Sequence, residues 1–421
     1  MKTPHLLRLD DTARLLAEGY RWLPGRLRRS TGGLARARIM GQPAVGLRGP
    51  EAVRFFYDER HVRRGGALPE PVRGTLFGKG GVHGLDGEMH RVRKSLFVTL
   101  LTDEKAVAAL VEQVAEAWDE AVPHWTGDTV LFDETSRILT RGVCRWAGVP
   151  VTDDMVAPLA SDLVSLVDGF GSLGRRHWQA RRARGRCEDW LVGLVEQVRA
   201  GEHLPAAGSP IEVVASHRDA GGELLSPHVA AVELLNIIRP TVAIAWFTAY
   251  AAHALHSWPE HRDRLAGEDS QYLAAFVHEV RRYYPFAPFV GGVAVTDLTW
   301  RGEAIRADSL VLLDLYGQNH DPALWGDPDT FRPERFLEHP VERDELVPQG
   351  GGDPSTGHRC PGEMITITLL EALCHRLARL DYEVPEQDLS ISLRRFPARL
   401  ASGFVFNPTR LQRESWGTDA A

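Results

Sequence analysis

Cysteine is scarce in this sequence, and its spacing shows no pairing pattern. The 421 residues contain four cysteines, Cys144, Cys187, Cys360 and Cys374, and no two of them are in C-x-x-C spacing. Cysteines so few and so scattered do not make a disulfide framework. The sequence is therefore not that of a small disulfide-stapled domain.

Positive charge is not in excess either. The formal net charge is −7 and the pI is about 6.2, which argues against nucleic acid as a partner of the chain as a whole. One basic stretch, RRHWQARRARGR, covers residues 175–186. We interpret it as a solvated helix face, with a docking or anion-attracting patch as the alternative.

Linkers, repeats and targeting segments are also missing. The most linker-like piece, EHLPAAGSP at 202–210, is short enough to be a surface loop, so we expect a single domain over residues 1–421. The start MKTPHLLRLDDTAR meets acidic residues before any apolar run long enough for a signal peptide. The apolar stretch around Arg239 is expected to be too short and too interrupted to span a bilayer. These features predict a cytoplasmic protein that does not cross a membrane.

The periodicity of the chain is mostly helical. With 43% hydrophobic and 25% charged residues, the composition is globular and ample for a large core. From Asp103 onward, apolar residues recur at i, i+3 and i+4 over long segments, which is typical of amphipathic helices. Strand-like pieces are PAVGLRG, VGGVAVTDLTW, SLVLLDLYG and LSISLRRFPARLASGFVF. The balance predicts a mainly α fold with small β-sheets.

The dipeptide Arg239-Pro240 stands in the middle of the apolar stretch LLNIIRPTVAIAWFTAYAAHAL. Its neighbours are apolar at nearly every helical phase, so the guanidinium has no solvated face. A buried arginine is costly unless an anion meets it. Proline removes a backbone donor and kinks the helix at that point. We therefore predict a broken helix that presents a buried cation to a carboxylate.

Cys360 lies in the segment GGGDPSTGHRCPGE. The glycine-rich run before it cannot be helical, and the run after it begins a helix with proline near the first turn. The sulfur should thus lie at a loop-to-helix junction, where backbone N–H groups and the positive helix end favour thiolate over thiol. A thiolate held by a rigid loop is a good axial ligand for iron, although a cysteine taken alone is more often structural.

Glu279 and Arg282 form an E-x-x-R pair within FVHEVRRYYPF. The i, i+3 spacing places them on one helix face, where they can pair, but such pairs are common by chance. The pair gains weight from two segments downstream, FRPERF at residues 331–336 and then the cysteine loop. We predict that these charges lock the loop that holds the thiolate.

The motifs E-x-x-R, F-R-P-E-R-F and G-H-R-C-P-G, in this order and spacing, resemble the cytochrome P-450 superfamily over essentially the whole chain. The resemblance implies a large helical domain with small sheets that encloses haem b. It makes Cys360 the proximal thiolate ligand of the iron. It also implies that Glu279 and Arg282, with Arg332 or Arg335, stabilise the core around that ligand.

Two departures from the usual pattern of the superfamily narrow the resemblance. Asp353 stands seven residues before the cysteine, where the usual loop has Phe. Arg239-Pro240 stands in the long helix over the haem, where ordinary members carry an acid–alcohol pair that relays protons. With the segments TLFGKGGVHGLDGEMH and RRYYPFAPF and the GGGDPxTGHRCPGE loop, Arg-Pro at this place resembles the bacterial fatty-acid peroxygenases.

This narrower resemblance implies that hydrogen peroxide oxidises long-chain fatty acids at the α or β carbon, giving hydroxy fatty acids, terminal alkenes or both. Without an acid–alcohol pair, cleavage of the peroxide O–O bond lacks its general acid–base group. A fatty-acid carboxylate held by Arg239 in a bidentate contact supplies that group and places the first carbons of the chain near the iron. No obligatory redox partner is then needed.

His83, within GGVHGLDGE, is the next catalytic candidate after Arg239 and Pro240. A histidine among glycines is by itself more often a loop or surface residue. By resemblance, this position lies above the haem near the β carbon of the substrate. Members with His here are similar to those that decarboxylate fatty acids to alkenes, whereas Gln is common in hydroxylating ones. An imidazole can donate or accept a proton as carbon dioxide leaves, and we expect both products.

Three cations are expected to bind a haem propionate, because by resemblance their helix passes one. His90 and Lys94 lie one helical turn apart in GEMHRVRKSLF, and Arg64 precedes them in HVRRGGALP. A solvated basic helix face is the alternative interpretation of the same residues.

Three aromatic residues are the remaining substrate-binding candidates. Phe77 and Phe289 would line the pocket near the haem, although plain core aromatics look identical in sequence. Phe170 would border the channel for the alkyl chain. Its neighbours Gly169 and Gly171 would let the backbone pass close to that chain, or simply mark a turn.

Two other functions fit parts of the sequence. A monooxygenase that acts on another carboxylic acid would need reductase partners, and the basic stretch 175–186 could then dock an acidic ferredoxin. Arg239-Pro240 argues against this alternative. A haem-binding sensor or fatty-acid carrier without turnover would leave a carboxylate-completed site without an evident purpose.

Overall fold

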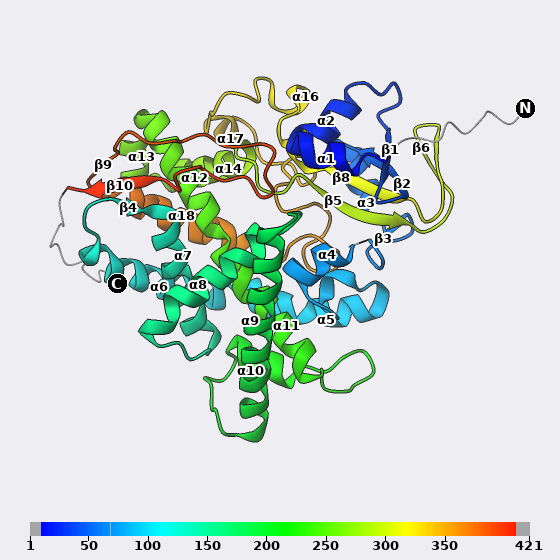
Figure 1. The fold of residues 1–421 in the computed structure, drawn as a ribbon. Helices are drawn as coiled ribbons and strands as arrows, with labels where there is room; N and C mark the ends of the chain where they lie inside the picture. Colours follow the sequence, from blue (N-terminus) through cyan, green and yellow to red (C-terminus); the bar gives the residue numbers. More distant parts are fainter. Residues whose placement is uncertain (1–9, 68, 410–421) are drawn as a thin grey trace, which may run out of the picture.

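The computed structural model describes residues 10–67 and 69–409, in which a large helical body lies beside a smaller sheet (Figure 1). The predicted mainly α fold class is confirmed. The longer helices are α5 (Gly87–Leu101), α6 (Glu104–Ala121), α7 (Leu131–Ala147), α8 (Asp153–Asp168), α9 (Arg175–Ala200), α11 (Pro227–Val242), α12 (Ile244–Ser257), α14 (Ser270–Tyr283) and α18 (Glu363–Arg379). The shorter helices are α1 (Thr12–Glu18), α2 (Trp22–Leu27), α3 (Pro50–Tyr57), α4 (Glu70–Val72), α10 (Pro210–Ser216), α13 (Arg262–Ala266), α15 (Leu315–Asn319), α16 (Pro322–Trp325) and α17 (Arg335–Glu338). Single turns of tighter or wider helix are η1 (Gly19–Arg21), η2 (Arg73–Phe77), η3 (Val82–Gly84), η4 (Val122–His124) and η5 (Pro259–His261).

The main sheet has five strands in the order β1-β2-β8-β5-β3. Its strands are β1 (Ala35–Ile39), β2 (Gln42–Leu47), β3 (Val62–Arg63), β5 (Phe289–Ala294) and β8 (Leu310–Asp314). β2 and β8 run parallel, with Val45 opposite Val311, and the other pairs are antiparallel. Met40 and Gly41, which join β1 to β2, both have positive φ, as a tight hairpin turn requires.

The smaller sheets are β4 (Thr129–Val130) with β10 (Val405–Pro408) and β9 (Tyr382–Glu383), and the hairpin of β6 (Leu298–Trp300) and β7 (Glu303–Ile305). Three of the strand predictions are confirmed by β2, by β5 with β6, and by β8. The segment that begins near Leu389 is mostly turns with one isolated bridge from Ile391 to Leu400, and only its last residues join a strand, β10.

The predicted broken helix around Arg239 is long and apolar. α11 ends at Val242 and α12 starts at Ile244, so the interruption falls at Ala243, within one turn of Pro240. The two helices form a run of 31 residues, Pro227–Ser257, that is long and apolar enough to cross a membrane. Our expectation that this stretch is too short was therefore wrong. The apolar part of this run is 89% buried inside the protein, so its composition is that of a core helix.

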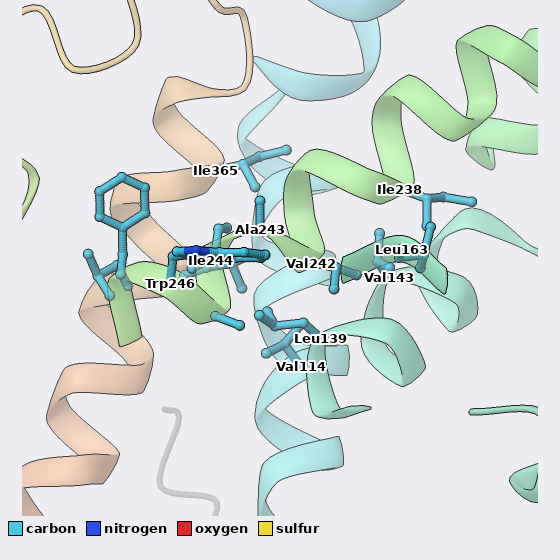
Figure 2. Packing of buried hydrophobic residues seen from close by; sticks show 14 of the residues in the cluster. Val114, Leu139, Val143, Leu163, Ile238, Val242, Ala243, Ile244, Trp246 and Ile365 are labelled. Carbon is cyan, nitrogen blue, oxygen red and sulfur yellow. The ribbon is translucent and has the colours of Figure 1, made fainter. Parts of the chain in front are cut away.

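The junction of α11 and α12 is where several helices meet. Figure 2 shows Val242, Ala243 and Ile244 at this junction, with side chains from neighbouring helices directed toward it. Those neighbours are Val114 on α6, Leu139 and Val143 on α7, Leu163 on α8 and Ile365 on α18. The core thus surrounds the part of the helix that carries Arg239 and fixes its position.

Close packing between α8 and α9 explains Gly169. A Cβ atom on Gly169 would lie 2.2 Å from the Cβ of Ala180, so only glycine permits this approach. Gly171 has a positive φ, as expected of a turn residue. Phe170 between them is half-buried and packs against both the helical core and the cluster under the main sheet. Gly169 thus permits the contact between the helices, and Gly171 permits the turn.

Replacing Gly169 by alanine is expected to lower the free energy of unfolding by about 1–3 kcal/mol, because the new methyl group overpacks the α8–α9 contact. Gly193 is the matched control, since it lies within α9 with open space where a Cβ would stand. Alanine there should raise stability by about 0.5–1 kcal/mol. Urea denaturation followed by circular dichroism measures both, and a neutral Gly169→Ala variant would contradict the packing argument.

Candidate active site

Cys360 lies at the predicted loop-to-helix junction. It precedes α18 by three residues, and its N–H donates to the Gln349 carbonyl at 3.4 Å. Burial raises the pKa of the thiol, while the Gly362 N–H and the charge on Lys94 lower it without outweighing burial. The backbone N–H contribution therefore has the expected direction, but burial, which the sequence did not reveal, is the larger effect on this pKa. A bound metal ion is what deprotonates a buried cysteine of this kind.

The glycine run before the cysteine packs tightly on α3. A Cβ on Gly351 would lie 2.2 Å from Val53, and one on Gly352 would lie 2.9 Å from the ring of Tyr57. Gly352 also has a positive φ, so larger residues are excluded there. The loop is therefore pinned to α3 by residues that have no side chain.

Asp353, which replaces the expected phenylalanine, closes the next turn of the loop. Its carboxylate accepts from the N–H groups of Ser355 and Thr356 at 2.8 and 3.1 Å, and Arg343 donates to it at 2.9 Å. The hydrogen bond from the Ser355 hydroxyl is the main reason that the pKa of Asp353 lies well below its usual value. Asp353 thus stabilises this turn of the loop through hydrogen bonds.

The Glu279–Arg282 pair forms as predicted and is fully buried. Two hydrogen bonds of 2.7 and 2.8 Å join the guanidinium to the carboxylate. Arg335 reaches the same carboxylate at 3.2 Å, whereas the Arg332 side chain pairs with the exposed Glu338. Of the two arginines that the sequence left open, Arg335 is therefore the side-chain partner, and Arg332 contributes its backbone N–H at 2.7 Å.

A second buried ion network was missed by the sequence analysis. Arg281 donates to Glu363, the first residue of α18, and to Gln349 at 2.7 Å. Arg359, next to the cysteine, donates to the same carboxylate at 2.6 Å. Both ends of the cysteine loop are thereby tied to α14. No local sequence motif predicts this ion network, because Arg281 and Glu363 are 82 positions apart.

Arg64, His90 and Lys94 converge with His358 on one side of the cysteine loop. The rings of His90 and His358 stack with centroids 3.8 Å apart, and Lys94 donates to the Arg359 carbonyl at 2.6 Å. Burial, with the charge of Lys94, lowers the pKa of His90 to about 4, and burial lowers the pKa of Lys94 to about 8. Burial is thus the main cause of both shifts, and the charge of Lys94 adds to the shift of His90.

This cluster fits the two carboxylates of a haem. Nδ1 of His90 and Nε2 of His358 are buried and have no hydrogen-bond partner among the described residues. A propionate would satisfy both atoms and offset the charge of Arg64 and Lys94. The solvated-face alternative is excluded, because His90, Lys94 and Arg64 are all buried.

Arg239 is buried to 6% exposure, as predicted, and lacks a full set of partners. Its Nη2 lies 3.5 Å from the Asn236 side-chain oxygen, and its Nε has no partner among the described residues. Burial lowers the pKa of Arg239 to about 9, and the charge of Arg184 adds to the effect. The Phe77 ring lies 5.9 Å from the guanidinium carbon. The site is thus open to an anion.

His83 lies on η3, within a ring contact of Phe77 at 4.3 Å between centroids. Its Nδ1 is buried and has no hydrogen-bond partner in the described part of the chain. Burial, and next the charge of Arg239, lowers the pKa of His83 well below its usual value. The imidazole is therefore neutral at pH 7.

A cavity of about 100 Å³ is lined by His83 and Phe77 together with Arg64, Arg73, Leu85 and five glycines.

Phe289 and the basic stretch 175–186 were also singled out in the sequence. Phe289, at the start of β5, packs with Trp22 at 6.4 Å between ring centroids, in the cluster under the main sheet. The basic stretch 175–186 is not simply a solvated face, because Arg184 is only 3% exposed. Arg184 donates to Glu188 at 2.6 Å and to the Leu76 carbonyl at 2.9 Å.

Comparisons with known proteins agree with this geometry. The cytochrome P-450 family model matches residues 265–412. A putative cytochrome P-450 137 of Mycobacterium tuberculosis is 27% identical over 210 residues, 48% of this chain and 43% of that protein. Cytochrome P-450 71D180 of Thymus vulgaris is 25% identical over 295 residues, 60% of this chain and 58% of that one. The chain thus matches about half the length of these curated relatives.

Solved structures match over nearly their full length. Cytochrome P450SP alpha (CYP152B1) in complex with (R)-ibuprofen has a TM-score of 0.92 and 44% identity, covering 95% of this chain and 98% of that one. The chain is a cytochrome P-450 of the CYP152 family. P450EX alpha (CYP152N1) with myristic acid gives 0.92 and 35%, covering 97% and 98%. A variant of OleT with arachidonic acid gives 0.91 and 34%, covering 95% and 96%. The family binds haem iron through a cysteine thiolate, which here is Cys360.

Replacing Glu279 by glutamine is expected to lower the free energy of unfolding by about 3–5 kcal/mol, because Arg282 and Arg335 then lie buried without their anion. Glu338→Gln is the matched control, since Glu338 pairs with Arg332 at the surface and its loss should cost less than about 1 kcal/mol. Denaturation of the haem-loaded protein followed by circular dichroism measures both. Equal losses in the two variants would contradict the assigned role of Glu279.

Proposed function

We propose that this protein is a peroxygenase that uses hydrogen peroxide to oxidise long-chain fatty acids at the α and β carbons. The products are hydroxy fatty acids, terminal alkenes from oxidative decarboxylation, or both. The observation that carries the proposal is the buried guanidinium of Arg239, which has no ion pair among the described residues. Myristic acid, arachidonic acid and (R)-ibuprofen, the molecules bound in the similar structures, are all carboxylic acids.

The guanidinium groups nearest Arg239 have carboxylate partners, whereas Arg239 itself has no ion pair among the described residues. Arg93 is paired with Glu233 at 2.8 Å, and Arg184 is paired with Glu188 at 2.6 Å. Both carboxylates are thus already engaged by other guanidinium groups. A substrate carboxylate completes the set, because a bidentate contact with Arg239 compensates its buried charge.

In the described part of α11 the one carboxylate, Glu233, lies six residues before Arg239 and is engaged by Arg93, so no acid stands beside Pro240. Thr241, next to Pro240, donates its hydroxyl to the Ile237 carbonyl at 3.1 Å and is therefore engaged. When bound, the haem supplies the iron chemistry by which hydrogen peroxide becomes an oxidant. The proton needed for cleavage of the peroxide must then be held by the carboxylate that Arg239 positions. Arg239 also holds the α and β carbons closest to that chemistry, because they adjoin the carboxylate.

His83 supports an alkene-forming branch of the reaction. Its imidazole is neutral, so Nδ1 or Nε2 can accept a proton or a hydrogen bond near the first carbons of the substrate. Phe77 contacts both His83 and Arg239, which supports a role for the two groups at the same end of the substrate. We propose that His83 influences which product leaves and that Arg239 with Pro240 decides whether turnover occurs.

The partners of the protein are inferred from its pairing of charges. Within the basic stretch 175–186, Arg181 pairs with Glu70 and Arg186 with Asp162, which leaves less free charge for an acidic ferredoxin. This favours hydrogen peroxide over a reductase partner.

Because the apolar helix is buried in the core, we also propose that the protein does not span a membrane and acts in the cytoplasm.

Purified haem-loaded protein given hydrogen peroxide and myristic acid is expected to form 2- or 3-hydroxy acids, the terminal alkene, or both. Arg239→Met should lose at least about 100-fold in turnover while haem stays bound, since both the clamp and the acid–base group are removed. Product analysis by gas chromatography measures this. Turnover only with NAD(P)H and a reductase, or an Arg239→Met variant as active as wild type, would overturn the proposed function.

His83→Gln is expected to lower the alkene fraction relative to hydroxy acids by severalfold, because glutamine cannot accept a proton as imidazole does. The ratio of the two products from one substrate is the quantity to measure, since it is independent of haem content. Phe77→Leu, which changes the ring contact but leaves the imidazole, is the matched control. An unchanged ratio in His83→Gln would remove His83 from the mechanism.

A further inference from the structure

Glu233 is a carboxylate of this chain that lies close to the substrate clamp. It is on α11, six residues before Arg239, and is fully buried. Its Oε1 accepts from the Val82 N–H at 2.8 Å and from Arg93 at 2.8 Å, and its Oε2 accepts from the Asn236 side chain at 3.2 Å. The three hydrogen bonds that it accepts therefore all come from groups other than Arg239.

Asn236 is the link between this carboxylate and the clamp. Its amide nitrogen donates to Glu233 and to the Phe77 carbonyl, and its amide oxygen faces Nη2 of Arg239 at 3.5 Å. One amide group thus separates a buried carboxylate from a buried guanidinium. In a medium of low dielectric, opposite charges so placed attract strongly. Without another cation, Glu233 would neutralise Arg239 and compete with the carboxylate of the substrate.

Arg93 is that other cation. It reaches across from α5, is only 7% exposed, and also donates to the Gly80 carbonyl at 3.3 Å. It pairs with Oε1 of Glu233, whereas Asn236, the link to Arg239, contacts Oε2. We propose that Arg93 is a positioning residue that holds Glu233 off Arg239 and so keeps the clamp free for the fatty-acid carboxylate. This inference rests on the proposed function of Arg239.

A simpler role for Arg93 would be to brace the glycine-rich loop, since it binds both Gly80 and the carboxylate that holds Val82. The two roles differ in what Glu233 does once Arg93 is gone. If Arg93 holds Glu233 off the clamp, removing the charge of Glu233 as well restores fatty-acid binding. If Arg93 is a brace, the second change cannot restore binding, because the loop has still lost its guanidinium.

The test is calorimetric titration of the haem-loaded protein, without peroxide, with myristic acid and with 1-tetradecanol, an alcohol of the same chain length. Arg93→Met is expected to weaken myristate binding by roughly tenfold and to leave tetradecanol binding within about threefold of wild type. Arg93→Lys keeps the charge and should bind nearly as wild type. Arg93→Met with Glu233→Gln should return to within about threefold of wild type. Arg91→Met, an exposed arginine of the same helix, is the control for a lost surface charge.

Equal loss in the single and double variants, no loss in Arg93→Met, or a parallel loss for tetradecanol would each overturn the inference. If Arg93→Met does not fold, Glu233→Gln alone decides, because glutamine still accepts from Val82. Binding of myristate as tight as wild type or tighter supports the inference, and weaker binding overturns it. Failure of the Arg239 clamp looks different, because wild-type protein would then not prefer myristate over tetradecanol at all. Failure of the peroxygenase function is separate again, because it shows as absent turnover with peroxide and not as a change in binding.

Discussion

The buried charge of Arg239 is the interaction on which the active site depends. A guanidinium at 6% exposure, without a carboxylate partner among the described residues, is unfavourable by several kcal/mol. The surrounding core holds it in place because α6, α7, α8 and α18 all pack at the junction of α11 and α12, just beyond Pro240. Binding of an acid relieves this cost, so part of the affinity for fatty acids comes from a site that is incomplete without them.

The two sides of the haem site differ in how completely their charges are paired. On the side of Cys360, Glu279 and Glu363 are each shared by two arginines, and the loop between them is fixed. On the side of Arg239, Arg93 and Arg184 are paired with carboxylates, whereas Arg239 has no ion pair within the described ranges. The first arrangement gives a rigid support for the ligand of the iron, and the second gives a receptor for an anion. The loop of Cys360 is thus held rigidly, whereas the site at Arg239 is complete only when an anion binds.

The sequence was most informative where chemistry depends on neighbours in the chain. The loop of Cys360, the i, i+3 pair Glu279–Arg282 and the Arg239-Pro240 break come from local rules, and the structure confirms their positions. Contacts between distant segments could not be predicted, because no local pattern encodes that Arg93 meets Glu233. The burial that raises the pKa of Cys360 could not be predicted for the same reason.

Other expectations depended on how long each helix is and how far the rest of the protein buries it. The apolar helix is longer than its sequence suggested because α11 and α12 continue almost without a gap, and Arg184 is buried because η2 covers it. Glycines at 169 and 171 proved to serve packing and a turn. The extent of the single domain, the cytoplasmic location and the pocket roles of Phe77, Phe170 and Phe289 stay predictions.

A crystal structure of the haem-loaded protein with myristic acid tests the central claim most directly. The account predicts that both carboxylate oxygens lie about 3 Å from the guanidinium nitrogens of Arg239, with the alkyl chain leading away toward the surface. The opposite orientation, with the methyl end beside the haem and the carboxylate at the channel mouth, would contradict it.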